Sequence, residues 1–323
     1  MNEKISPNLG LSLVRVTEAA ALAAGRWMGC GNAVIANRLA ADAMACIFNS
    51  LDIDGHIVIG EEGRLGVSSP FNSGAQVGNG NGPAMDVVTD PIDGTARLIK
   101  GLPGAMSVAG IAPRSSMWSP FPAVYMEKII VGADAADALV PECIDAPAAW
   151  TLALVARAKG KPVRDLVVFV LDRTRHKDMI SEIQATGARV MAHSQGDVAG
   201  ALMAASRDVN VDILMGTGGV SEGVIAACAV KSLHGAMLGR LDPQTAEERA
   251  GIRNANLDTK QILTCDELVK GSNIYFAATG ITGGVMLEGV HYHGEIATTE
   301  SVIIRCETGT RRIVHTEHLI DEG

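Results

Sequence analysis

The sequence has few aromatic residues, no close pair of cysteines and no long apolar run. Aromatic residues make up 3% of the 323 residues and hydrophobic residues 47%, so the predicted core consists of aliphatic and methionine side chains. The six cysteines form no C-x-x-C pair and have no zinc-ligand spacing, which is typical of free thiols in a reducing compartment. No apolar run reaches the roughly 18 residues of a membrane span, and the first residues lack the apolar segment of a signal peptide. We therefore predict a cytoplasmic protein without a membrane partner.

The sequence also lacks an excess of positive charge. Its 27 Lys and Arg residues are outnumbered by 36 Asp and Glu residues, which gives a formal charge of −9. Because nucleic-acid binding requires basic patches, the composition argues against a nucleic-acid partner. A phosphorylated substrate would need metal ions and a few local Lys or Arg residues to overcome the overall repulsion.

An apolar run followed by an acidic turn is the most informative stretch. Residues 84–88 are predicted to form a buried strand, and Pro91 is predicted to end it because proline cannot donate a ladder hydrogen bond. The turn would leave Asp90 and Asp93 at the mouth of the strand, where both could approach one point. Two carboxylates in such a place can bind a hard divalent cation.

The residues that follow fit a phosphate. Gly94 allows close backbone approach, Thr95 offers a hydroxyl, and free N–H groups beside them suit a phosphate group. Aspartates in a turn rich in Gly and Pro are more often ordinary connectors than ligands. However, residues 90–95 match the D-P-[IL]-D-G-T signature of the metal-dependent, lithium-sensitive sugar and inositol phosphatases, and this favours a site.

The remaining pattern indicates an α/β protein with two domains. Two N-terminal helices are predicted over residues 14–28 and 34–49, and a strand at 56–59. Residues 141–147 are predicted to be a linker. We therefore expect an N-terminal metal-binding α+β domain over 1–145 and a C-terminal α/β substrate-binding domain over 146–323. The buried face of the second helix is predicted to contain Leu39, Ala43, Met44 and Ile47.

The second half alternates strands and helices. This spacing predicts a largely parallel sheet, which binds ligands at the carboxyl ends of its strands. The predicted strands cover 166–171, 188–192 and 211–215, and the predicted helices 148–159, 177–186, 197–205 and 222–233. Strands near 273–278 and 301–306 are expected to complete the sheet.

From about Arg15 to His318 the chain resembles the class II fructose-1,6-bisphosphatases, as a divergent member. The motifs that carry the resemblance are Arg15-Val16-Thr17-Glu18, Asp52-Ile53-Asp54-Gly55, Ile57 to Glu61, Asp90 to Thr95, Tyr125 to Lys128, Arg175-His176, Gly196 to Ala199, Gly218-Gly219, Glu222-Gly223, Ala278 to Thr282, Leu287 to Gly289 and Ile296 to Glu300. The resemblance implies a layered α/β/α/β/α fold with two sheets, Mg²⁺ or Mn²⁺ as cofactor and a homo-oligomer, either a dimer or a tetramer. It also implies a sugar phosphate as substrate and a role in carbohydrate metabolism such as gluconeogenesis.

The resemblance also implies roles for individual residues. The implied metal ligands are Glu61, Asp90 and Asp93, with Asn37 as a weaker oxygen donor. Thr95, which would orient the attacking water, and Glu61 are the implied catalytic residues. The implied substrate-binding residues are Asp93, Gly94, Thr95, Tyr125, Arg173, Thr174, Arg175, Gln195, Gly196, Asp197 and Gly219.

The chain departs from the family pattern at several of these places. Ala33 and Asn37 replace a Lys and a metal-binding Asp that lie four residues apart on one helical face. Leu65 falls at or near a second acid, and Asp93 replaces a Glu. One metal ion is therefore better supported than two.

Two triplets of the implied sugar site also differ. The usual D-G-D is Gln-Gly-Asp at residues 195–197, and the usual Lys-Pro-Arg is Arg-Thr-Arg at 173–175, which keeps two positive charges. We therefore predict a phosphatase acting on a sugar phosphate, with a shifted substrate as one outcome. The alternative is a weakened or inactive paralogue that binds a sugar phosphate or a partner enzyme.

Two further groups of residues have an ordinary structural interpretation. His291 and His293 lie on one side of an extended segment and could bind zinc, but without further ligands they are better explained as exposed or hydrogen-bonded histidines. His315 and His318 are interpreted in the same way. Glu222 follows two glycines at a helix start, where an acidic residue is as often a capping residue as a functional one.

Overall fold

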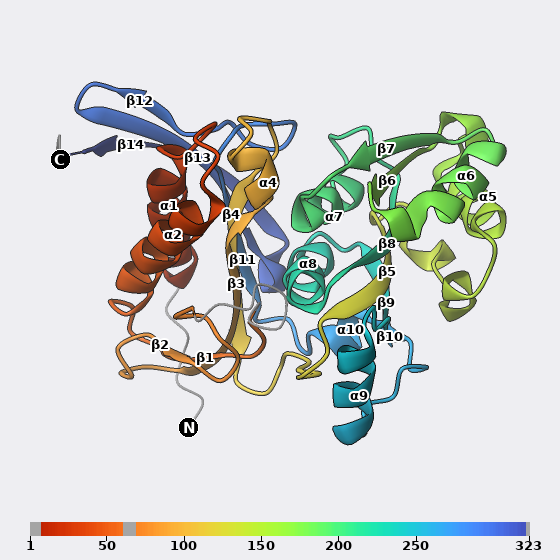
Figure 1. The fold of residues 1–323 in the computed structure, drawn as a ribbon, viewed down its shortest axis with the longest axis horizontal. Coiled ribbons are helices and arrows are strands. Elements are labelled where there is room, and N and C mark those ends of the chain that lie inside the picture. The colour runs from red at the N-terminus through yellow and green to blue at the C-terminus, as the bar shows by residue number, and fades with distance from the viewer. Residues whose placement is uncertain (1–7, 61–68, 321–323) are drawn as a thin grey trace. The chain divides into compact units, whose positions relative to one another are not determined.

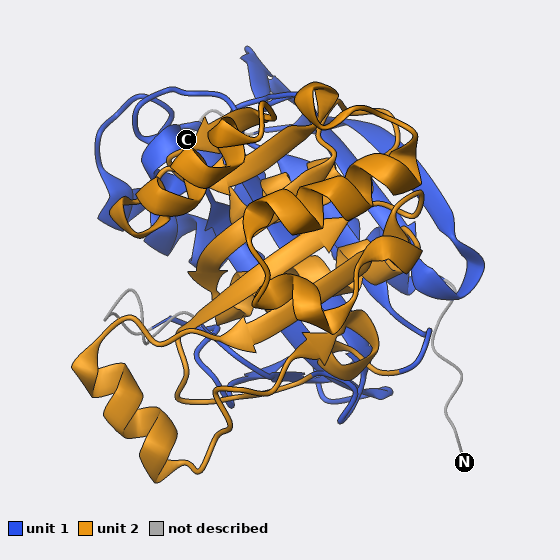
Figure 2. Cartoon of the chain, turned by 90° about the vertical axis from the view of Figure 1, so that its right-hand side faces the viewer, with its two compact units in different colours: residues 1–117, 271–323 blue, residues 118–270 orange. Residues whose placement is uncertain are grey.

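The computed structural model describes residues 8–60 and 69–320, and the chain divides into two compact units (Figure 1). Unit 1 contains residues 1–117 and 271–323, and unit 2 contains residues 118–270 (Figure 2). These limits differ from the predicted division at residue 145, because β11 (Tyr275–Gly280) near the chain end pairs with β4 (Met106–Pro113) of the first half. The predicted linker was wrong, since Cys143 and Ile144 are buried in the core of unit 2.

Unit 1 contains an eight-stranded sheet. Its order is β12-β13-β11-β4-β3-β1-β2. Strand β12 pairs with the first residues of β13 and β11 with its last residues, while β14 pairs with β13 along its whole length. The pair β1 and β3 is parallel, and the remaining pairs are antiparallel. The other strands of this sheet are β1 (Asp54–Ile57), β2 (Gln76–Val77), β3 (Ala84–Asp93), β12 (His291–His293), β13 (Ile296–Arg305) and β14 (Thr310–Leu319).

Two helices cover one face of this sheet. Helix α1 (Leu9–Gly25) contacts β3, β4, β11 and β13, and it also packs against α2 (Ala33–Phe48). Asn32 is the N-cap residue of α2. Its side-chain oxygen accepts a hydrogen bond from the backbone N–H of Ile35.

The buried residues of α2 differ from the predicted face. They are Ala36, Ala40, Ala41, Met44 and Phe48. Only Met44 was predicted correctly. The alanines allow close approach between the helices, while Leu39 and Ile47 lie at the borders of the interface and are partly exposed.

Unit 2 contains a six-stranded sheet in the order β10-β9-β5-β8-β6-β7. Strand β6 is parallel to β7 and β8, but β5 is antiparallel to β8 and β9, and β10 is antiparallel to β9. The sheet is therefore mixed, and the prediction of a largely parallel sheet was wrong. Its strands are β5 (Tyr125–Val131), β6 (Val167–Leu171), β7 (Arg189–His193), β8 (Ile213–Gly219), β9 (Ala236–Leu241) and β10 (Leu263–Thr264).

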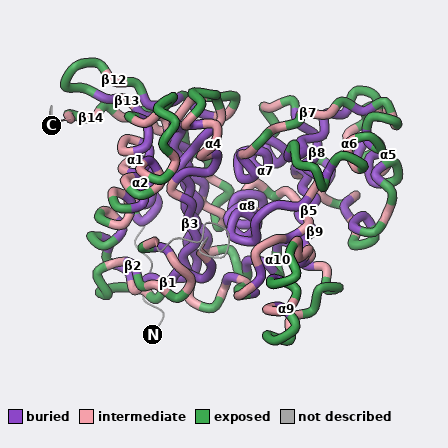
Figure 3. The backbone as a smooth tube through the Cα atoms, in the orientation of Figure 1, coloured by how far each residue is buried: buried purple, intermediate pink, exposed green. Residues whose placement is uncertain are grey.

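Helices cover both faces of the second sheet. Helices α7 (Asp197–Ala205) and α8 (Val220–Ser232) pack on one face, and α5 (Ala148–Lys159) and α6 (Lys177–Ala185) contribute to the apolar core on the other (Figure 1). Nearly all of α8 is buried (Figure 3). The short helices are α4 (Thr95–Leu98), α9 (Ala246–Asn254) and α10 (Cys265–Leu268).

The mixed α/β class with two sheets is thus confirmed. Within residues 8–60 and 69–320, we find no helix with the length and apolar character needed to cross a membrane. All six cysteines are free thiols.

Candidate active site

The predicted acidic turn is an irregular part of strand β3. Asp90 pairs with Val108 of β4 and Asp93 pairs with Met106. Strand β3 therefore has one more residue between these two pairs than β4 has, which is a β-bulge. Pro91 lies within this bulge, where no ladder hydrogen bond is required of it. The strand therefore continues to Asp93, and the prediction that the strand ends at Pro91 was wrong.

The bulge places the two aspartates on the same face of the sheet. Val108 and Met106 are two residues apart and share a face, and each paired aspartate lies on the face of its partner. Without the extra residue, side chains three positions apart would point to opposite faces. Both carboxylates are buried, with 4% of Asp90 and 3% of Asp93 exposed. The backbone N–H of Ile92 donates to Oδ1 of Asp90 at 2.9 Å, which helps to fix this carboxylate.

The turn after β3 depends on glycine. Gly94 has φ of 96° and precedes α4, and a Cβ atom there would lie 3.3 Å from the Cα of Ala105. The hydroxyl of Thr95 lies 3.0 Å from Oδ1 of Asn37 and 3.2 Å from the carbonyl oxygen of Ile92, and it donates its single proton to these acceptors. Its oxygen lone pairs are therefore available to accept a hydrogen bond from a water molecule.

Only part of the predicted metal site can be located. Asp90 and Asp93 are brought together, whereas Asn37 on α2 reaches this region through its contact with Thr95. Glu61 and Leu65 lie outside the described residues. Across residues 8–60 and 69–320, no group of three or more His, Cys, Asp or Glu side chains could hold a metal ion. The two buried carboxylates nevertheless fit a hard divalent cation in their donor chemistry.

In unit 2, several predicted substrate residues surround the end of β8. Arg175 donates from Nε and Nη2 to the carbonyl oxygen of Thr217, at 3.2 and 2.7 Å. Its guanidinium also lies over the ring of Tyr125, 5.2 Å from the centroid. Arg175 extends from the short 3₁₀ turn Thr174–His176, which follows β6.

His176 also binds the end of β8, through the backbone N–H of Thr217. The backbone N–H of Thr217 donates to Nε2 of His176 at 2.8 Å, so Nδ1 carries the proton and donates to the carbonyl oxygen of Leu171 at 2.6 Å. Desolvation by burial is the largest cause that lowers the pKa of His176. The imidazole is therefore neutral at pH 7, and it connects the ends of β6 and β8.

A buried ion pair supports the predicted residues Asp197 and Gly219. The ammonium of Lys128 donates to Oδ2 of Asp197 and to the carbonyl oxygen of Gly219, the latter at 3.2 Å. The side chain of Lys128 is 1% exposed and that of Asp197 is 8% exposed. Gly218 has no room for a side chain, because a Cβ atom would lie 1.9 Å from Oδ2 of Asp197.

The other predicted sugar residues are less closely tied to this cluster. Arg173 and Thr174 are exposed, and Gln195 is partly exposed. Gly196 adopts the left-handed conformation, with φ of 98°, and precedes α7.

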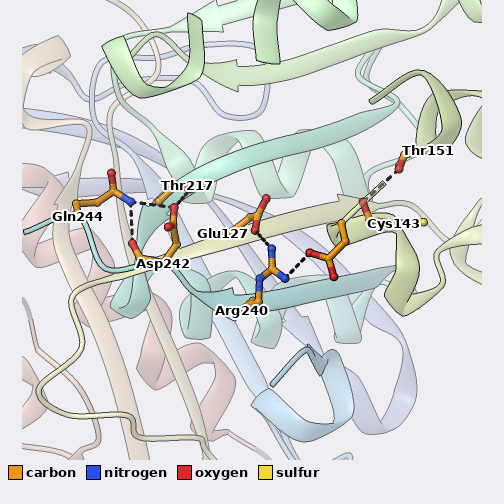
Figure 4. Close-up of polar contacts among 8 residues, drawn as sticks. Glu127, Cys143, Thr151, Thr217, Arg240, Asp242 and Gln244 are labelled. Atoms are coloured by element: carbon orange, nitrogen blue, oxygen red, sulfur yellow. Dashed lines mark hydrogen bonds and ion pairs between the residues drawn. The ribbon is translucent and has the colours of Figure 1, made fainter. Parts of the chain in front are cut away.

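Next to Tyr125, the sheet face bears a polar cluster of Glu127, Thr217, Arg240, Asp242 and Gln244 (Figure 4). The guanidinium of Arg240 donates to Glu127 at 2.8 Å and to Asp145 at 2.6 Å. Burial is the main reason that the pKa of Glu127 is raised, although Arg240 opposes the shift.

The sequence argument missed Lys128, His176, Thr217 and Asp242 as parts of this region. Lys128 and His176 lay inside the quoted motifs, and their proximity to predicted residues was the available signal. No local pattern identifies Thr217 and Asp242, since they meet only when β8 and the end of β9 are placed.

The remaining candidates have structural partners. His315 lies 3.3 Å from Glu300, and Nε2 of His318 lies 2.9 Å from the hydroxyl of Thr299. His291 and His293 are exposed, with stacked rings. Glu222 is buried in the first turn of α8, where the hydroxyl of Ser221 donates to it at 2.9 Å.

Comparison with known proteins connects both regions to one family. Residues 7–318 match the family described as bacterial fructose-1,6-bisphosphatase, glpX-encoded. The chain is 36% identical over 326 residues to fructose-1,6-bisphosphatase 1 class 2 of Escherichia coli (strain K12), which covers 97% of this chain and 96% of that protein. The same figures hold for fructose-1,6-bisphosphatase class 2 of Shigella flexneri.

Proposed function

This chain belongs to the family of bacterial, glpX-encoded fructose-1,6-bisphosphatases, and we propose that it hydrolyses a sugar phosphate at Asp90–Thr95 with Mg²⁺ or Mn²⁺ as cofactor. The family consists of phosphoric monoester hydrolases of carbohydrate metabolism that depend on a divalent metal ion. The choice of metal, the sugar and the roles of individual residues are part of the proposal.

The observation that carries the proposal is the bulge in β3. It places Asp90 and Asp93 on one face of the sheet, buried and directly before the Gly94–Thr95 turn. Two buried carboxylates on one face offer the oxygen donors that a divalent cation prefers, and the cation would balance their charge. A divalent ion held by Asp90 and Asp93 would supply Lewis-acid polarisation of the phosphoryl oxygens and activation of a water molecule.

The side chains of the chain itself then position the reacting groups. Asp90 and Asp93 hold the cofactor, with Glu61 as a further carboxylate of the same role. Gly94, which adopts φ of 96° before α4, is proposed to let the backbone approach the scissile phosphate closely. The Thr95 oxygen accepts a hydrogen bond from the attacking water while its own hydroxyl donates to Asn37, so the water is oriented for in-line attack on phosphorus.

For unit 2 the proposed role is sugar-phosphate binding by the residues around the end of β8. Arg175 and Arg173 offer positive charge to a second anionic group, and Asp197 and Gly219 are proposed to face the sugar. Lys128 keeps the Asp197 carboxylate fixed, which reduces the conformational cost of binding.

The test is phosphate release from a panel of sugar mono- and bisphosphates with Mg²⁺ and with Mn²⁺. We expect turnover of at least one compound and a loss of about 100-fold or more in Asp90→Asn, because removal of a group that holds or orients the reacting groups has an effect of this order. The exposed Asp42→Asn on α2 is the matched control and should retain activity. If several compounds bind and none is hydrolysed, the protein is instead a non-catalytic binder of sugar phosphates.

A homo-oligomer in the cytoplasm completes the proposal. Strand β14 supports the first part, since among the described strands it pairs only with β13 and presents alternately exposed side chains along its length. The six free thiols support the second part. Light scattering on the purified protein distinguishes a dimer or tetramer from a monomer.

A further inference from the structure

Asp242 directly follows strand β9 and is hydrogen-bonded to three residues, of which Figure 4 shows Thr217 and Gln244. Its backbone N–H donates to the carbonyl oxygen of Tyr125 at 3.0 Å. Its Oδ2 accepts hydrogen bonds from the hydroxyl of Thr217 at 2.6 Å and from the amide of Gln244 at 2.8 Å. The carboxylate is therefore held in one orientation.

Arg175 contacts two of these three residues, Tyr125 and Thr217. It lies over the Tyr125 ring and donates to the carbonyl oxygen of Thr217. Two of its five N–H groups are used in this way. Asp242 and Arg175 are thus neighbours, but in the part of the chain that the structure describes they form no ion pair with each other.

Two nearby carboxylates form ion pairs, whereas Asp242 forms none among the described residues and interacts with Arg175 only at longer range. Lys128 balances Asp197, and Arg240 balances Glu127. Within residues 8–60 and 69–320, the hydrogen bonds to the Asp242 carboxylate come from a neutral hydroxyl and a neutral amide. Its negative charge therefore acts on whatever binds at Arg175. The exposed Arg173 adds positive charge, so an anion is still accepted, but less strongly than it would be by two arginines alone.

We propose that Asp242 is a specificity-determining residue that weakens binding of a second phosphate at Arg175 and favours a substrate with a hydroxyl group at that end. The proposal rests on the proposed sugar-phosphate hydrolysis. A phosphate dianion is repelled by the fixed carboxylate, while a sugar hydroxyl can donate a hydrogen bond to it.

The test compares two substrates that differ only in the second phosphate. We would measure kcat/KM for fructose 1,6-bisphosphate and for fructose 1-phosphate with Mn²⁺, in the unchanged protein and in Asp242→Asn. The amide oxygen of Asn can still accept from Thr217, so the exchange removes the charge and keeps the shape. The ratio of the two kcat/KM values, bisphosphate over monophosphate, should rise on the order of 10-fold, and the rise should shrink at high salt.

The controls separate a local effect from a change in net charge. Asp137→Asn neutralises an exposed carboxylate of unit 2 far along the chain from this cluster and should leave the ratio unchanged. Asp242→Ser removes the same charge with a smaller side chain and serves if the Asn variant does not fold. A ratio that stays within about twofold, or falls, in the folded variant overturns the proposal.

A second measurement does not depend on turnover. Without added metal, calorimetric titration of fructose 1,6-bisphosphate should give a dissociation constant on the order of 10-fold lower for Asp242→Asn than for the unchanged protein. If neither protein hydrolyses either substrate but this tightening occurs, the role of Asp242 stands and the proposed hydrolysis fails. If hydrolysis occurs without any tightening, the hydrolysis stands and the role of Asp242 fails.

Discussion

Replacing Lys128 by Met should destabilise unit 2 strongly. The Lys128 side chain is 1% exposed, and its ammonium contacts the Asp197 carboxylate, which is 8% exposed. Removing the cation leaves a buried carboxylate without its partner, a change that costs about 3–5 kcal/mol. Such a loss is a large share of the roughly 5–15 kcal/mol that stabilises an ordinary domain. With a urea m-value of about 2 kcal/mol/M, the unfolding midpoint should fall by roughly 2 M.

The assay follows urea unfolding by circular dichroism and includes a double variant. In Lys128→Met with Asp197→Leu, two apolar side chains replace the ion pair, and such replacements are often neutral or stabilising. The double variant should therefore regain most of the lost stability while its affinity for sugar phosphates stays low, because Asp197 is absent. The exposed Lys177→Met in unit 2 is the matched control and should shift the midpoint by less than about 0.5 M.

Two results would refute this reasoning. If Lys128→Met keeps its midpoint within about 0.5 M of the unchanged protein, the pair contributes little and its burial has been overvalued. If the double variant regains sugar-phosphate affinity together with stability, Asp197 does not contact the substrate.

Three further predictions concern metal binding, activity and pH. Asp90→Asn should lose Mn²⁺ affinity at least about 10-fold more than Asn37→Ala, because a full charge binds a hard cation better than a dipole. Calorimetric titration of Mn²⁺ measures both losses, and equal losses would contradict this prediction. The double variant Ala33→Lys with Asn37→Asp restores the charged face of α2 that the family pattern has. If the chain lost activity by losing this face, the variant should hydrolyse fructose 1,6-bisphosphate at least ~10-fold faster, which corresponds to a barrier lower by about 1.4 kcal/mol. Unchanged activity on every substrate would show that the face is remote from the chemistry. Because the pKa of His176 is lowered in the folded protein, the unfolded chain takes up a proton near pH 6.5 and the folded chain only at lower pH. The free energy of unfolding should therefore fall by up to about 1.4 kcal/mol per pH unit below pH 6.5. Denaturation from pH 7.5 to 5 should show this extra slope in the unchanged protein and lose it in His176→Gln.

The sequence predicted the elements better than their pairing. Helix α5 was predicted over its observed range, and strands β6 and β7 were placed within one residue at each end, because apolar runs and Gly or Pro punctuation are local signals. Strand β8 was predicted to end four residues too early, and β9 and β10 were not predicted. The mixed character of the second sheet and the return of β11 to β4 are contacts between distant segments, and no local pattern encodes them.

The site shows the same division. The motif at residues 90–95 identified the carboxylates, but the bulge that brings them to one face depends on pairing with β4. Likewise, the basic residue Arg175 was predicted, whereas Thr217 as its acceptor follows from the placement of β8 beside β6. The roles of these residues in binding and catalysis stay predictions.

The discontinuous composition of unit 1 has a consequence for synthesis on the ribosome. Strand β4 is made early, but its neighbour β11 begins at Tyr275, after the whole of unit 2. Until those residues leave the exit tunnel, one edge of β4 and part of the apolar face of α1 lack their permanent contacts. Unit 2 is continuous from residue 118 to 270 and can complete its own sheet first. The nascent chain therefore carries an unfinished sheet edge through about half of its synthesis, and this edge is where chaperones would be needed.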